Sequence, residues 1–161
     1  SCRTCTKLII GRIHGKAVGG GVGIASAVDY AFATDAASIK LSELAVGIGP
    51  FVVGPAVERK IGLSAMSDLA INATAWRSAK WATSKGLYMQ TFETIELMDE
   101  GIATLIEKLR HSNPEAMSAL KSVFWKGTEH WETLLSERAK ISGSLVLSDF
   151  TRNAIQAFKK S

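Results

Sequence analysis

The chain has 161 residues, of which 47% are hydrophobic, and a formal net charge of +4 at pH 7. This composition predicts one globular domain, or part of one, with a sizeable core, and it excludes a disordered chain. The basic residues are scattered and form no dense patch, so we expect no nucleic-acid partner. The longest apolar run, Ala45 to Val57, is shorter than the roughly 20 residues that a membrane span needs.

The first part of the chain alternates strands with a helix. Lys7–Ile13 is short, apolar and β-branched, which predicts a buried strand, and His14–Val18 predicts a turn. A helix is expected at Gly20–Val28 and a strand at Tyr30–Thr34. Alternating residues at Ser38–Leu41 predict a third short strand. This order is an α/β pattern.

After Pro50 the sequence pattern becomes helical. Helices are expected at Phe51–Ile61, Ser64–Ala73, Ser78–Gly86, Glu93 or Thr94 to Arg110, from Pro114 onward, Glu129–Ile141 and Asp149–Lys159, with one strand at Leu87–Gln90. We therefore divide the chain into a core region, residues 1–90, and a helical region, residues 91–161. Phe124, Trp125 and Trp131 are expected to lie in the core or at a contact between subunits.

Cys2 and Cys5 have the C-x-x-C spacing, but no second pair or nearby histidine completes a zinc site. They also do not begin a predicted helix, as a redox pair would. We interpret them as incidental thiols and expect no metal. Free cysteines fit a reducing, cytoplasmic compartment.

Three consecutive glycines, Gly19, Gly20 and Gly21, separate the first predicted strand from the first predicted helix. Without Cβ atoms, this backbone can approach another group closely. The first amides of a helix have no partner inside it and carry partial positive charge, so they suit an oxyanion. Glu43 follows in an apolar stretch. A turn rich in donors and a carboxylate together suggest enolate chemistry. In a simpler interpretation the glycines only allow tight packing, and Glu43 is a surface residue at a strand end.

Several segments together resemble the crotonase superfamily, the enoyl-CoA hydratase/isomerase family. They are the strand Ile9-Ile10, Gly15, the glycines Gly19-Gly20-Gly21, Asp29, the stretch Lys40 to Gly47, Ile61-Gly62, Ala79-Lys80-Trp81-Ala82 to Gly86-Leu87, and Ser148-Asp149 to Ala157-Phe158. The similarity runs from about Lys7 to Lys160. The glycine and Glu43 regions are specific when taken together.

The resemblance implies an α/β fold, a crotonase-like ββα spiral core followed by a C-terminal helical region. Family members have further βα structure before the strand that leads to the glycines. We infer that this chain is a fragment or remnant that lacks an N-terminal part; alternatively, a partner replaces the missing half. The resemblance also implies an acyl-CoA thioester as substrate, no separate cofactor, and a homotrimer or hexamer.

Site residues follow from the same resemblance. The amide of Gly20 would stabilise the enolate oxygen, and a second amide would come from the missing part. Glu43 would be the general acid/base, with a pKa raised by Leu44, Ala45 and Val46. Gly19, Gly21 and Gly23 would bind substrate.

One departure from the family affects the reaction. Hydratases of the family carry a second glutamate at the position of Gly23, which has no side chain. Some hydratases of branched, glutaconyl-type thioesters share the Gly-Gly-Gly-Val-Gly sequence, so we expect a hydratase that adds water to a 2-enoyl-CoA. The alternatives are an isomerase that moves the double bond with Glu43 alone, and a non-catalytic crotonase-fold binding protein.

Overall fold

The computed structural model describes residues 2–158 and contains two three-stranded sheets. The first sheet has the order β1 (Ile10–Ile13), β3 (Tyr30–Thr34) and β6 (Gln90–Phe92), and all of its pairs are parallel. Residues 31–34 of β3 are buried, as expected for the apolar central strand of a parallel sheet. The strand predicted at Leu87–Gln90 begins later than expected, because Leu87 and Tyr88 enter the core before the pairing with β3 starts.

The second sheet contains β2 (Lys16–Val18), β4 (Ser38–Lys40) and β5 (Arg77–Ser78). The turn predicted at His14–Val18 is wrong in its second half, because Lys16–Val18 pairs in parallel with β4. The two-residue β5 pairs antiparallel with β4 and has no counterpart in the prediction. The two residues of β5 are too few to show an alternating pattern.

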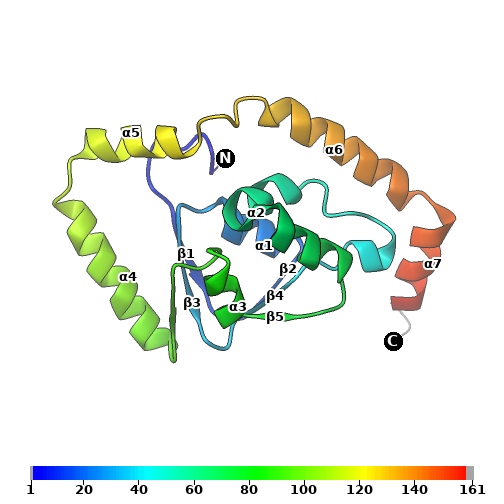
Figure 1. The fold of residues 1–161 in the computed structure, drawn as a ribbon, viewed down its shortest axis with the longest axis horizontal. Helices are drawn as coiled ribbons and strands as arrows, with labels where there is room; N and C mark the ends of the chain where they lie inside the picture. The colour runs from blue at the N-terminus through cyan, green and yellow to red at the C-terminus, as the bar shows by residue number, and fades with distance from the viewer. Residues whose placement is uncertain (1, 159–161) are drawn as a thin grey trace.

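Three helices belong to the core region: α1 (Gly20–Ala27), α2 (Gly54–Ile71) and α3 (Ala79–Ser84). The first two pack against each other in the centre of the molecule (Figure 1). Val22 of α1 and Val57 of α2 are fully buried, and both belong to one apolar core that also includes Ile39 and Leu41. The core therefore lies directly beneath the glycine turn.

Gly62 breaks α2 into two parts. The sequence predicted separate helices at Phe51–Ile61 and Ser64–Ala73. The structure has one element over this region, but Gly62 has φ 77° and ψ 162°, which are not helical angles. A positive φ is favourable only for glycine. The predicted division is confirmed as a break in the backbone.

Four further helices follow: α4 (Ile95–Arg110), α5 (Pro114–Phe124), α6 (Trp131–Val146) and α7 (Asp149–Phe158). Figure 1 shows them as an arc around the core region. Side chains of Thr94 and Asn113 cap the first two. The predicted helix Asp149–Lys159 agrees with α7, although its last residue lies outside the described part of the chain. Trp125 is buried, Trp131 is partly buried and Phe124 is 47% exposed.

A buried polar cluster joins α5 to the start of the core. Lys121 of α5, with only 2% of its side chain exposed, places Nζ 2.5 Å from Asp29 Oδ2 and 3.2 Å from the carbonyl of Lys7. The indole of Trp125 and the amide of Ile9 also donate to the Asp29 carboxylate. Both buried charges are thus paired and hydrogen-bonded, which buried charges require.

Candidate functional site

The parallel pairing of β2 with β4 brings the glycine turn and Glu43 to the same edge of the second sheet. The register aligns Val18 with Lys40, the last residues of the two strands. The amide of Gly19 donates to the carbonyl of Lys40 at 3.0 Å, which fixes the turn against the end of β4. Glu43 follows three residues later. Two segments about twenty residues apart in the sequence therefore meet in space.

The carboxylate of Glu43 lies against Gly19. Gly19 has φ 52° and ψ −111°, and the Cβ of an alanine at this position would be only 2.8 Å from Glu43 Oε1. Real Cβ atoms do not come this close to a neighbour, so the absence of a side chain at residue 19 leaves the space that the carboxylate occupies. The glycine and Glu43 form one structural unit.

Glu43 is half-buried, and its Oε2 is buried without a hydrogen-bond partner among the described residues. Burial raises the pKa of Glu43 above its ordinary value of 4.5, and a hydrogen bond from its own backbone amide only partly opposes this. A buried polar atom without a partner is unusual in a folded protein and is often explained by a functional role. A carboxyl group with a raised pKa is suited to accept and donate protons in catalysis.

The direction of this pKa shift agrees with the expectation from sequence. Glu43 precedes a short 3-10 helix, η1 (Leu44–Val46), whose residues are not buried. Leu44 is 50% exposed and Ala45 is also exposed, whereas Val46 is partly buried. Gly19 approaches the carboxylate closely from across the sheet edge.

Gly20 begins α1 and is exposed, with no atom within 4 Å of the place where its Cβ would be. Its amide has no acceptor among the described residues, since the first hydrogen bond of the helix runs from Gly23 to Gly19. The positive end of the helix dipole and a free N–H therefore begin one residue after Gly19, which lies against the Glu43 carboxylate. This arrangement can hold negative charge on an oxygen atom.

The other predicted substrate-binding glycines differ in their surroundings. Gly21 is exposed, and its Cβ would make an ordinary contact of 3.5 Å with Ala17. Gly23 is buried, and its Cβ would lie 2.7 Å from Cγ1 of Val53. Val53 therefore fills the space where a side chain at position 23 would begin. The sequence analysis missed Val53, because nothing in an apolar stretch shows which valine packs on a glycine thirty residues earlier.

Within residues 2–158, no group of three or more His, Cys, Asp or Glu side chains is arranged to hold a metal ion. Cys2 and Cys5 are both free thiols. None of the helices in this part of the chain combines the length and apolar character needed to cross a membrane.

The family model described as enoyl-CoA hydratase/isomerase matches residues 1–160. The chain belongs to this family. It is 28% identical over 158 residues to the peroxisomal Delta(3,5)-Delta(2,4)-dienoyl-CoA isomerase of Arabidopsis thaliana, which covers 95% of the chain and 55% of the relative. It is 29% identical to the "Probable enoyl-CoA hydratase" of Bacillus subtilis, in a match that covers 94% of the chain and 59% of the relative. It is 31% identical to the carnitinyl-CoA dehydratase of Escherichia coli K12, in a match that covers 73% of the chain and 45% of the relative.

Solved structures confirm the crotonase fold. An enoyl-CoA hydratase from Mycobacterium avium superposes with a TM-score of 0.91 at 23% identity and covers 99% of the chain. Another, from Bacillus halodurans, superposes with a TM-score of 0.87 at 21% identity and covers 97%. The chain spans 62% of each of these two structures and between 45 and 59% of the three relatives.

Proposed function

We propose that this chain carries the proton-transfer part of an active site that adds water to a 2-enoyl-CoA thioester. The observation that supports this most directly is the buried, unpartnered Oε2 of Glu43, whose carboxylate lies against Gly19, the residue before the free amide of Gly20. One group can move protons, and the other can stabilise an oxyanion. The relatives named enoyl-CoA hydratase and carnitinyl-CoA dehydratase favour chemistry in which water is added or removed.

In the proposed reaction, the oxygen of water forms a bond to the β-carbon of the thioester while Glu43 takes the proton of that water. The electrons of the double bond move to the thioester oxygen, and the amide of Gly20 stabilises the resulting enolate. Glu43 then returns a proton to the α-carbon, so the net change is the addition of one water. A donor of this kind contributes about 2.7–4 kcal/mol to the transition state.

A specific observation supports a second candidate, an isomerase. Residue 23 is a glycine, and Val53 fills the space where its side chain would begin. This position therefore supplies no second carboxylate to act with Glu43. A single carboxylate can remove a proton from one carbon of the acyl chain and return it two carbons away. This step moves the double bond without a change of mass. The relative named as a dienoyl-CoA isomerase is consistent with it.

The test uses the full-length protein with a short trans-2-enoyl-CoA and, separately, a 3-enoyl-CoA, and measures product mass. Gain of one water supports the hydratase. Conversion of the 3-enoyl-CoA to an isomer of equal mass, without hydration, supports the isomerase.

The role of Glu43 is tested separately. Glu43→Gln should lower kcat by about 10²-fold or more, because it removes the proton-transfer group. Glu93→Gln, at an exposed glutamate outside the site, is the matched control and should leave kcat unchanged. Equal rates for the two variants, or no turnover of either thioester by the unmodified protein, would contradict the proposal. The homotrimer or hexamer and the cytoplasmic location stay predictions.

A further inference from the structure

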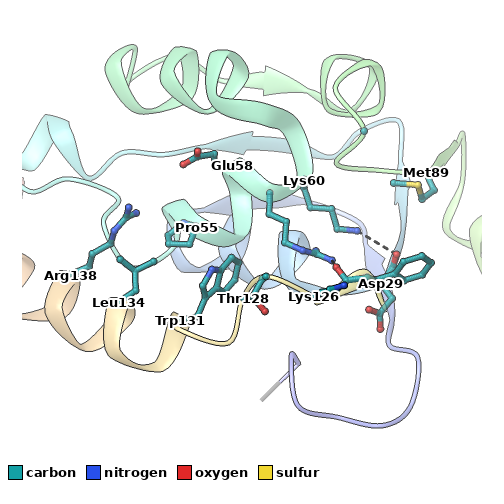
Figure 2. Close-up of a pocket in the computed structure, with 14 residues that line it drawn as sticks. Asp29, Pro55, Glu58, Lys60, Met89, Lys126, Thr128, Trp131, Leu134 and Arg138 are labelled. Carbon is teal, nitrogen blue, oxygen red and sulfur yellow. Dashed lines mark hydrogen bonds between the residues drawn. The ribbon is translucent and has the colours of Figure 1, made fainter. Parts of the chain in front are cut away.

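A cavity of about 830 Å³ lies between α2 and the segment that connects α5 to α6 (Figure 2). Neither Glu43 nor a residue of the glycine turn lines it. One wall is Asp29, which follows the C-terminal end of α1, whereas Gly20 begins that helix. The eight residues of α1 separate these two ends by roughly 12 Å. The cavity is thus distinct from the candidate active site.

Basic side chains outnumber acidic ones in the walls of this cavity. Arg59, Lys60, Lys126 and Arg138 line it, together with the acids Glu58 and Asp29. The negative charge of Asp29 is already paired with buried Lys121. Glu58 is exposed to solvent. The four cations therefore face one remaining carboxylate.

None of these four cations forms an ion pair within the part of the chain that the structure describes. Arg59 donates to the carbonyl of Phe124 and stacks on Trp125, with its guanidinium carbon 4.0 Å from the ring centroid. Lys60 donates to the backbone carbonyl of Asp29 at 3.4 Å. Burial lowers the pKa of both Arg59 and Lys60. Partly buried cations without a carboxylate partner favour the binding of an anion.

The cavity also has an apolar part. Figure 2 shows Arg138 toward one end and Lys60 and Lys126 toward the other, with Pro55 and Trp131 between them. Leu134 adds a further apolar contact from α6. A ligand that fits this distribution has anionic groups attached to a planar or apolar body. Guanidinium and ammonium groups bind phosphoryl oxygens well, and aromatic side chains contact planar rings.

We propose that this cavity binds a small organic phosphate with a planar body, such as a nucleoside polyphosphate, at a site separate from that of the thioester substrate. ADP is the probe, with inorganic pyrophosphate and adenosine as two further arms that separate the contribution of charge from that of the ring. Isothermal titration with the full-length protein should give a Kd of about 1 mM or tighter for ADP. Binding should weaken as salt is added, because the contacts are ionic.

The variants Lys126→Gln and Arg138→Gln each remove one cation at the edge of the cavity. Each should weaken ADP binding about tenfold, as expected for the loss of one charge-assisted hydrogen bond. Lys140→Gln is the matched control, because Lys140 is an exposed residue of α6 that does not line the cavity. This control should bind ADP as the unmodified protein does.

Competition decides whether the site is separate. In kinetic assays with an enoyl-CoA, ADP is expected to be non-competitive with the substrate. Competitive inhibition together with unchanged binding in Lys126→Gln and Arg138→Gln would place ADP in the active site and overturn the proposal. Absence of ADP binding to the full-length protein would overturn it as well. Neither result depends on whether the enzyme is a hydratase or an isomerase.

Discussion

Replacement of Gly19 by alanine should damage the fold and the site together. An alanine must adopt φ 52° and ψ −111°, a conformation that costs a residue with a side chain about 1–3 kcal/mol. Its Cβ would also stand 2.8 Å from Glu43 Oε1, where an ordinary contact needs at least 3.4 Å. The carboxylate must therefore move by more than half an ångström, or the turn must open.

This displacement predicts the size of the kinetic effect. Misplacement of a reacting group by about 1 Å can lower a rate by 10²-fold. We expect Gly19→Ala to lower kcat by between about tenfold and 10²-fold, and to lower the free energy of unfolding by about 1–3 kcal/mol. Urea denaturation measures the second quantity, and steady-state kinetics with an enoyl-CoA measure the first.

Gly15→Ala is the matched control, because no atom lies within 4 Å of its Cβ position and its φ is not in the left-handed region. It should leave both quantities close to those of the unmodified protein. If Gly19→Ala behaves like Gly15→Ala in both assays, then the close contact between residue 19 and Glu43 does not control the site, and the reasoning is wrong.

Three further predictions concern charge and packing. Burial raises the pKa of Glu43 in the folded state above its ordinary 4.5, so the stability that this group contributes is present at pH values below 4.5 and is lost as the pH rises through the folded pKa. Glu43→Gln should therefore be more stable than the unmodified protein at pH 7, and this difference in stability should decrease toward pH 4. Denaturation curves at several pH values measure the difference. A difference that stays constant with pH would contradict the prediction. Lys121→Met removes the ion-pair partner of the buried Asp29 and should lower the free energy of unfolding, measured by urea denaturation, by about 3–5 kcal/mol. The control Arg110→Met removes an exposed pair with Glu107 and should lower it by less than about 1 kcal/mol. Similar losses for the two variants would refute this prediction. Gly23→Ala places a methyl group against Val53 and should lower the free energy of unfolding by about 1–3 kcal/mol. Gly21→Ala, in the same helix, has room for the methyl group and should leave the protein as stable as before or more stable. Urea denaturation that finds Gly21→Ala the less stable of the two variants would contradict this prediction.

Local patterns in the sequence were sufficient for the main elements of the site. A β-branched strand and three glycines predicted that a helix begins at Gly20, and the strand predicted at Ser38–Leu41 placed Glu43 just after a strand. The fold class was also predicted, through the resemblance, and the comparisons confirm it. These features depend on residues that are close together in the chain, so their signals are strong.

Features that depend on distant residues could not be predicted in this way. β2 and β5 have three and two residues, and only their pairing with β4 makes them strands. Asp29 and Lys121 are separated by 92 positions, and neither residue alone shows that both are buried. Burial of Glu43 was expected from its apolar neighbours, yet Leu44 is 50% exposed and no residue of the 3-10 helix is buried.

The bond between Lys121 and Asp29 also determines how the chain can be shortened. A truncation after α4 would retain every strand, the glycine turn and Glu43. It would nevertheless remove the only cation that forms an ion pair with Asp29 within the described residues, together with the indole of Trp125. Proteolysis between α4 and α5 should therefore release a core with an uncompensated internal charge. A shortened form of the chain therefore needs α5, even if the remaining C-terminal helices are removed.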